Sequence, residues 1–444
     1  MNYQDLTQVL IKRCLARGAD QAEVFLETGR QLSLEIRNGQ VETVQEAAAQ
    51  GAGLRVFVQG RMGFCSCNDL SEQALDAAIR SAVGLAKNMT SDPSHVLPQS
   101  EPSTDVPGLY DPEIARVPMD TKIELAKAVE RLALKDSRIT KSAGSAYGEG
   151  LSEVFIANSL GLAKSFKSSA CFFRVEVVAE KGEQKSSGGD FCARRFFADL
   201  KKPEDVAAKA ARDAYEMLDP RMVKTQRAAV IFHPDAAGAL LGGILAATNG
   251  ERVLQGTSFL AGSLNGKIGS DLLTIVDDGT RPKGMASRPF DGEGVPTEKR
   301  TVIDRGVLRG FMYNTVVGKK AGVKSTGNAS RGDFQSLPDI GGHNFFLAAG
   351  GTPPEEIIRA TPAGLLLKEV TGYGINPVTG QFSGGASGLW IENGRVSFPV
   401  KGLTVAGTAA EMFNGLDLVG NDLDLNLAFS APTFRIVSLQ IGGE

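Results

Sequence analysis

The sequence predicts an α+β protein in which two α-β-β-β-α units precede a β-rich C-terminal domain with few helices. Three observations support this prediction. The order of helix-like and strand-like segments in residues 1–91 recurs after a Pro-rich linker. The 52 glycines indicate many turns, which are typical of β-rich folds. From residue 223 onward, short strand-like runs separated by glycine turns dominate.

The first predicted unit spans residues 1–91 and begins with an amphipathic helix. Its apolar residues Leu6, Leu10 and Cys14 keep helical spacing, and Gly18 ends it. Strand-like segments follow, the second of which contains an Asn-Gly turn signal: AEVFLET, LSLEIRNGQVET, AGLRVFVQG and RMGFCSC. The helix SEQALDAAIRSAVGLAKNM closes the unit.

A Pro-rich linker over residues 92–118 separates this unit from a second one over residues 119–222. Ile123, Ala126 and Val129 mark its first helix. Its strand-like segments are LSEVFIANSLGLAKSF, CFFRVEVVAEKG and GDFCARRFFADL, and PEDVAAKAARDAYEML is its closing helix. Phe-Cys pairs at matching places in both units favour a duplication, with chance similarity of two α+β segments as the alternative.

The C-terminal domain, residues 223–444, opens with an apolar strand, AAVIF, that leads into a helix. Asp235 is the predicted N-cap of this helix, and Leu240, Leu241 and Ile244 are its predicted buried stripe. Two hairpins are expected in TVIDRGVLRGFMYN and LWIENGRVSFPV, the second turning at Asn393-Gly394.

Composition excludes several functional classes. The net charge is -3, so the chain lacks the basic surface that nucleic-acid binding requires. The five cysteines form no C-x-x-C pair, which favours free thiols in a reducing compartment. No apolar run reaches the ~20 residues that cross a bilayer, and the N-terminal helix carries charges unlike a signal peptide. We therefore expect a cytoplasmic protein with neither membrane nor nucleic acid as partner.

The three histidines offer little catalytic chemistry. His95 lies in the linker, and His343 in a glycine loop is expected to be solvated. His233, at the end of the first C-terminal strand, is the best placed, although packing at a strand–helix junction is the more ordinary role. The chain contains no H-E-x-x-H zinc motif, P-loop or G-x-G-x-x-G fingerprint.

Three long glycine-punctuated blocks resemble the TldD/PmbA family, once labelled modulators of DNA gyrase, and the resemblance covers nearly the whole chain. The third of these blocks is similar to the PmbA (TldE) version of the family. They are NGQVETVQEAAAQGAGLRVFVQGRMGFCS, FDGEGVPTEKRTVIDRGVLRGFMYNTVVGKKAGVKSTGNASRG and GLLLKEVTGYGINPVTGQFSGGASGLWIENGRVSFPVKGLTVAGTAAEMF.

This resemblance implies a cytoplasmic metallopeptidase system that acts on unfolded or extended peptides. The TldD-type member carries an H-E-x-x-x-H helix whose histidines, with a C-terminal cysteine, hold zinc, and whose glutamate is the base. Alignment places Gly242 and Gly243 at the first His and the Glu, and Ala247 at the second His; the C-terminal tail lacks cysteine. We therefore expect no catalytic residue, metal or other cofactor in this chain, with zinc held by a TldD-type partner.

Two loops are candidates for a peptide-binding surface that acts by strand addition. STGNASRG contributes Thr326, Asn328 and Arg331, and TGYGINPVTGQFSGGASG contributes Thr371 and Tyr373. Ordinary tight turns are the alternative for both loops. We expect a dimer or higher oligomer, in which this chain meets the TldD-type subunit and the peptide substrate.

Two other functions remain open. The chain could be a self-sufficient metallopeptidase with a metal bound by His233 and nearby carboxylates. It could also be a non-enzymatic, homodimeric peptide-binding module. Stoichiometric metal in the lone chain favours the first alternative, and a homodimer indifferent to TldD-type chains favours the second.

Overall fold

The N-terminal half contains two α-β-β-β-α units, which confirms the predicted repeat of this element order. The computed structural model describes residues 2–372 and 374–444, the side chain of residue 239 apart. The first unit consists of α1 (Tyr3–Ala16), β1 (Gln21–Arg37), β2 (Gln40–Val58), β3 (Arg61–Cys67) and α2 (Glu72–Asn88). The second consists of α3 (Met119–Ala133), β4 (Ile139–Asn158), β5 (Ala163–Lys181), β6 (Gln184–Arg194) and α4 (Pro203–Glu216).

The two units share one six-stranded antiparallel sheet of order β3-β2-β1-β4-β5-β6, because β1 pairs with β4. Segments AEVFLET and LSLEIR form the single strand β1, since Gly29 stays in register with Ala49 of β2. The hairpin turns at Asn38-Gly39, as predicted; both residues have positive φ (51° and 71°), which the two-residue hairpin turn requires.

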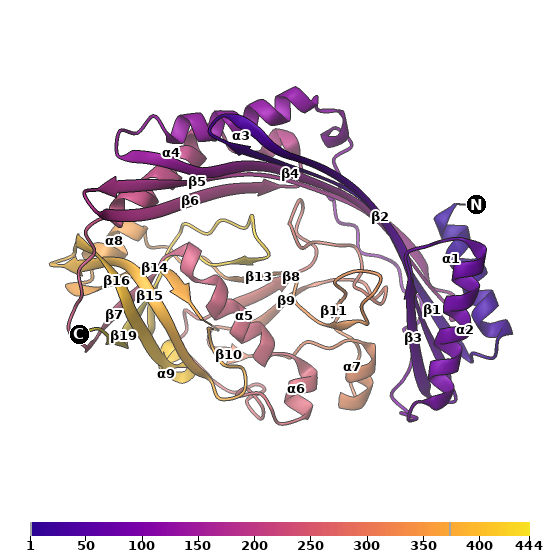
Figure 1. Cartoon of the computed structure of the whole chain (residues 1–444). Coiled ribbons are helices and arrows are strands. Elements are labelled where there is room, and N and C mark those ends of the chain that lie inside the picture. The colour runs from indigo at the N-terminus through magenta and orange to yellow at the C-terminus, as the bar shows by residue number, and fades with distance from the viewer. Residues whose placement is uncertain (1, 373) are drawn as a thin grey trace.

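All four long helices cover one face of this sheet. Leu32 and Leu34 of β1 join a core with α3 and α4, while Val24 and Leu54 join a second core with α1 and α2. The opposite face curves over the C-terminal region, so that the sheet forms an arch above it (Figure 1). The fold thereby leaves one sheet face to meet the C-terminal half.

The C-terminal half is β-rich with short helices, which confirms the predicted α+β class. Its main sheet has the order β16-β15-β14-β7-β19-β17, and an added β16–β19 pairing closes five strands into a ring. Its strands are β7 (Gln226–Phe232), β14 (Ala363–Thr371), β15 (Gln381–Glu392), β16 (Arg395–Thr408), β17 (Leu416–Val419) and β19 (Phe434–Gly442). The β15–β16 hairpin turns at Asn393-Gly394, as predicted.

A second sheet has the order β10-β9-β8-β13-β18 and contains the other predicted hairpin, β9–β10. The remaining strands are β8 (Ile275–Asp278), β9 (Lys299–Asp304), β10 (Val307–Leu308), β11 (Ala329–Ser330), β12 (Asp339–Ile340), β13 (Asn344–Leu347) and β18 (Phe429–Ser430). The helices are α5 (Gly238–Ala247), α6 (Gly250–Leu254), α7 (Thr315–Ala321), α8 (Pro354–Arg359) and α9 (Ala409–Gly415). The domain boundaries at residues 91, 118 and 222 stay predictions.

A buried ionic network joins the two halves. Arg55 of β2 donates to Glu23 of β1 at 2.7 Å and to Glu293 of the C-terminal half at 2.9 Å. Arg331 donates to the other oxygen of Glu23 and lies 5.0 Å above the Phe25 ring. Across the described residues, no helix is both long and apolar enough to span a membrane.

Candidate functional site

Strand β7 leads into helix α5 through one 3-10 turn, η3 (Pro234–Ala236). The prediction that Asp235 caps α5 is wrong, because this turn intervenes and α5 begins only at Gly238. His233 caps the turn instead, its Nδ1 accepting from the Asp235 backbone N–H at 3.3 Å. Leu240, Leu241 and Ile244 pack into the core and fix the helix, as expected from their spacing.

The three residues of α5 that the resemblance predicts at the family's zinc-site positions, Gly242, Gly243 and Ala247, differ in their surroundings. A Cβ built on Gly242 meets nothing within 4 Å, whereas one on Gly243 lies 2.5 Å from the Ile375 carbonyl oxygen. Ala247 is fully buried, and Ser258 Oγ donates to its carbonyl at 2.6 Å. Helix α5 therefore has room for a side chain at position 242 and none at position 243.

A cleft of about 780 Å³ lies between the N-terminal sheet with α4 and the C-terminal half. Its walls come from β5, β6 and α4 on one side and from the β7–α5 junction, β14 and the segment 422–431 on the other. Gly238 lines this cleft, and Gly242 follows it one turn later on α5. The face of α5 that carries Gly238 and Gly242 thus begins at the cleft.

A charged cluster holds the cleft wall in place. The Lys209 ammonium group lies 2.9, 3.1 and 3.4 Å from carboxylate oxygens of Asp235, Asp213 and Asp190. Burial alone would lower the pKa of Lys209, but these three charges outweigh it and raise the pKa. Burial favours a raised pKa for Asp235, yet its contact with the His233 ring at 3.2 Å and the Lys209 ammonium group hold that pKa well below its usual range.

Exposed apolar side chains face this cleft from both walls. Phe191 of β6 is 47% exposed, and Leu427 and Phe429 of the opposite segment are 42% and 36% exposed. Apolar groups exposed to water on two facing walls are typical of a surface that binds apolar side chains of another molecule.

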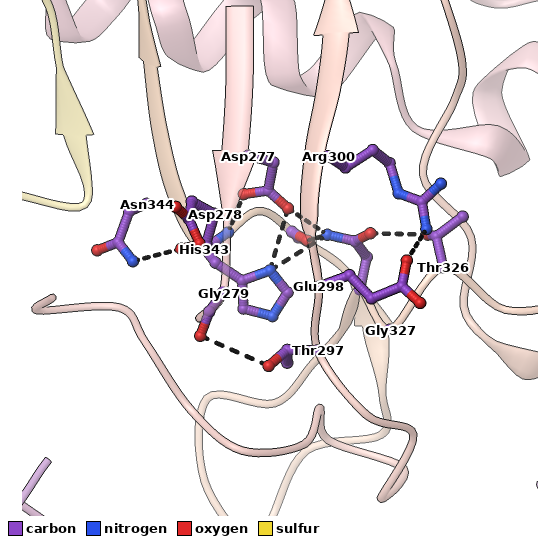
Figure 2. Close-up of polar contacts among 12 residues, drawn as sticks. Asp277, Asp278, Gly279, Thr297, Glu298, Arg300, Thr326, Gly327, His343 and Asn344 are labelled. Atoms are coloured by element: carbon purple, nitrogen blue, oxygen red, sulfur yellow. Dashed lines mark hydrogen bonds and ion pairs between the residues drawn. The ribbon is translucent and has the colours of Figure 1, made fainter. Parts of the chain in front are cut away.

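Thr326 and Asn328, predicted to bind substrate, lie in a buried polar network around Asp277 and His343 (Figure 2). Asn328 Nδ2 donates to Asp277 Oδ2 at 2.8 Å, and Thr326 Oγ1 donates to Asn328 Oδ1 at 2.7 Å. His343 Nδ1 lies 3.0 Å from the same Asp277 oxygen. The expectation that His343 is solvated is wrong: it is 4% exposed, because it packs against Asp277 of β8 and Asn328 of the 325–332 loop.

The other predicted substrate-binding residues lie elsewhere. Arg331 belongs to the buried network with Glu23, and its guanidinium also donates to the Gly292 carbonyl at 2.7 Å. Thr371 is exposed at the end of β14, opposite Gly385 of β15. Tyr373 lies outside the described residues. The structure thus brings together Thr326 and Asn328 only, and the substrate-binding role of all five stays a prediction.

Three family models together match most of the chain. They are the PmbA/TldA metallopeptidase domain 1 over residues 22–86, the central domain over 112–218 and the C-terminal domain over 225–443. The chain belongs to the PmbA/TldD family.

Individual relatives agree with this family. The chain is 33% identical to "Metalloprotease PmbA" of Escherichia coli O157:H7, covering 97% of this chain and 94% of that protein. It is 29% identical to "Metalloprotease PmbA homolog" of Haemophilus influenzae, covering 95% and 92%. The crystal structure of TldE from Thermococcus kodakarensis superposes with a TM-score of 0.90 at 26% identity, over 98% of this chain and 99% of that one.

The zinc ion implied by the PmbA/TldD family does not fit the residues of α5. Gly242, Gly243 and Ala247 carry no side-chain atom that ligates a metal. Over residues 2–372 and 374–444, no three or more His, Cys, Asp or Glu side chains gather in a way that could hold a metal ion.

Sequence reasoning missed the cleft residues Lys209, Asp190, Leu427 and Phe429. In the sequence, Phe191 stands out only as half of a repeated Phe-Cys pair. One signal was present in the sequence: in GDFCARRFFADL, Phe191 alternates with Cys192, so one of the two must face away from the helix-covered core. The facing apolar residues Leu427 and Phe429 come more than 200 positions later, and no local pattern could pair them with Phe191.

Proposed function

We propose that this chain is a PmbA/TldE-type subunit of a TldD/PmbA-like metallopeptidase, has no zinc site of its own and works with a zinc-bearing TldD-type partner. The observation that carries the proposal is helix α5, whose residues Gly242, Gly243 and Ala247, at the positions predicted for the family's ligands and base, have no side-chain atom that binds metal or moves a proton. The Ile375 carbonyl, 2.5 Å from a Cβ at position 243, leaves no room for a glutamate there. Proteolysis by the assembly then depends on the partner's zinc.

The contribution of this chain is to hold an unfolded or extended peptide in the cleft. Phe191 on one wall and Leu427 and Phe429 on the other would contact its apolar side chains. The charged side chains around Lys209 in the cleft wall are already paired with one another. They would therefore disfavour charged peptide segments, whose charges would lose hydration in the cleft without gaining a partner. The name "Metalloprotease PmbA" of the Escherichia coli relative supports a peptide substrate.

Casein cleavage tests the proposal. The chain alone, supplied with zinc, should leave casein intact, and a TldD-type subunit at a concentration where it is inactive alone should become active when the chain is added. Chelation should abolish this activity, and the lone chain should contain far less than one zinc per molecule. Chelator-sensitive turnover by the lone chain would overturn the proposal.

A pair of variants tests the cleft separately. Phe191→Ser should lower turnover by the mixture several-fold, because it removes an apolar contact from the cleft wall. Phe172→Ser is the control, since Phe172 is 37% exposed on the adjacent strand β5 but does not line the cleft. Equal effects of the two substitutions would reject the cleft as the peptide site while leaving the assignment of the subunit intact.

The two alternative functions predict different results. In the self-sufficient metallopeptidase, the carboxylates near His233 would bind the metal; against this, the Lys209 ammonium group already lies among Asp190, Asp213 and Asp235. In a homodimeric binding module, the chain would bind casein without turnover, whether or not a TldD-type chain is present.

A further inference from the structure

Two of the five cysteines form a C-x-C pair on an edge strand. Cys65 and Cys67 lie on β3, at one edge of the N-terminal sheet, and both thiols are half-buried, whereas the other three cysteines are buried. Side chains two residues apart on a strand point to the same face. Accordingly, both cysteines pack against the core that α1 and α2 form with the sheet. The two thiols thus lie side by side at the rim of the sheet, where a solute can reach them.

The two thiols are close to each other, but each has its own hydrogen-bond acceptor. Cys65 Sγ donates to the Ser66 carbonyl at 3.8 Å, and Cys67 Sγ donates to the Asp69 carbonyl at 2.9 Å. Burial raises the pKa of Cys65, and the neighbouring Cys67 raises it further. Cys65 is therefore a thiol and not a thiolate at neutral pH, and a metal that binds it has to displace its proton.

The strand geometry disfavours a disulfide between these two cysteines. Residues 61–67 of β3 pair with residues 52–58 of β2 without any shift of register, so the backbone around the pair is regular. Residues two apart in such a strand have Cα atoms roughly 6.6–6.8 Å apart, and their nearly parallel Cα–Cβ bonds keep the Cβ atoms at a similar distance. A relaxed disulfide needs Cβ atoms about 3.5–4.5 Å apart, so it would have to break the ladder.

A single metal ion can bridge the two sulfurs without moving the backbone. Two collinear metal–sulfur bonds of about 2.3 Å span about 4.6 Å, which the side chains reach by rotation about χ1. Within the part of the chain that the structure describes, no three or more His, Cys, Asp or Glu side chains gather around a metal position. Structural zinc takes four ligands and an iron–sulfur cluster takes four cysteines, so a pair of thiols suits neither. Cu(I) is the soft ion that two thiolates satisfy.

We propose that Cys65 and Cys67 bind one Cu(I) ion between their two sulfurs. Each thiol loses its proton to solvent as its sulfur bonds to the metal, so that one Cu(I) and two thiols give a two-coordinate bis-thiolate unit of charge -1 and two protons. Neither copper nor sulfur changes its oxidation state. The inference does not rest on the proposed function, because β3 lies at the opposite edge of the sheet from β6, which lines the cleft.

Anaerobic titration of the full chain tests the site, with the chromogenic chelator bicinchoninate as competitor. The chain should withdraw one Cu(I), and Cys65→Ser and Cys67→Ser should each lower its affinity by more than the roughly 10–100-fold that loss of an outer-shell partner costs. Cys14→Ala is the matched control, since Cys14 is fully buried in the same core and should leave the affinity unchanged. No withdrawal of Cu(I), equal affinity in Cys65→Ser, or equally tight binding of zinc would each overturn the inference.

A displaced thiol and the pH dependence test coordination by both sulfurs. Cys65→Ser combined with Ser66→Cys keeps the number of thiols but places one of them on the other face of β3, so it should bind Cu(I) no better than Cys65→Ser alone. In the unaltered chain, the affinity should rise roughly 10–100-fold from pH 6 to pH 7, about ten-fold for each sulfur that loses a proton. Full affinity in the displaced variant, or an affinity independent of pH, would overturn the inference, and circular dichroism verifies that each variant is folded.

Discussion

Two neighbouring glycines of α5 have different reasons to be glycine. Gly242 faces open space, so a methyl group there contacts nothing, whereas at Gly243 it meets the Ile375 backbone at 2.5 Å. Gly242 therefore satisfies no packing requirement of the chain itself, while Gly243 permits a close backbone approach.

We predict opposite effects of alanine at these two positions. Gly242→Ala should stabilise the chain by about 0.5–1 kcal/mol, because glycine in a helix interior costs that much conformational entropy. Gly243→Ala should destabilise it by about 1–3 kcal/mol through overpacking. Urea unfolding of both variants measures the difference, and equal stabilities would contradict the packing at Ile375.

At the scale of elements, the β1–β2 hairpin depends on a residue of α3. Its Asn-Gly turn is encoded locally, but two backbone donors of the turn are satisfied by Glu130, more than 90 residues later. Local sequence thus bends the hairpin, and a helix of the second unit fixes where its tip lies.

Glu130→Ala should therefore lower the free energy of unfolding by about 1–3 kcal/mol, because it leaves the Asn38 and Gly39 N–H groups without their acceptor. Amide exchange at the turn should become faster than in the rest of the sheet. Glu124→Ala, on the exposed face of the same helix, should change stability by less than about 0.5 kcal/mol. Similar losses in both variants would argue against Glu130 as the acceptor that stabilises the turn.

At the scale of the whole molecule, buried charges connect the arch to the C-terminal half. Glu23, Arg55 and Glu293 are all at most 2% exposed, and they come from β1, β2 and a loop more than 230 residues away. The charges of Glu23 and Glu293 outweigh the effect of burial and raise the pKa of Arg55, so it stays protonated.

Arg55→Met should destabilise the protein by about 3–5 kcal/mol, because it leaves the buried Glu293 carboxylate without its arginine partner and Glu23 with Arg331 alone. Arg30→Met is the matched control on the same sheet: its pair with Glu46 is exposed, and its loss should cost less than about 1 kcal/mol. Thermal unfolding with separate probes for the two halves would also show whether Arg55→Met uncouples them. Comparable costs for the two variants would argue against a structural role for the buried network.

The sequence by itself determined the repeated order of helices and strands, the Asn-Gly hairpin turns and the family, because periodicity, turn residues and long glycine-punctuated blocks are local patterns. It also determined that α5 lacks ligating side chains, since this follows from residue identity alone. Only the tertiary structure decided that Arg331, Asn328 and His343 are buried among partners, and that Phe191 faces Leu427 and Phe429 across a cleft. Burial and facing walls arise from segments hundreds of residues apart, and a local pattern carries no information about which distant segment covers it.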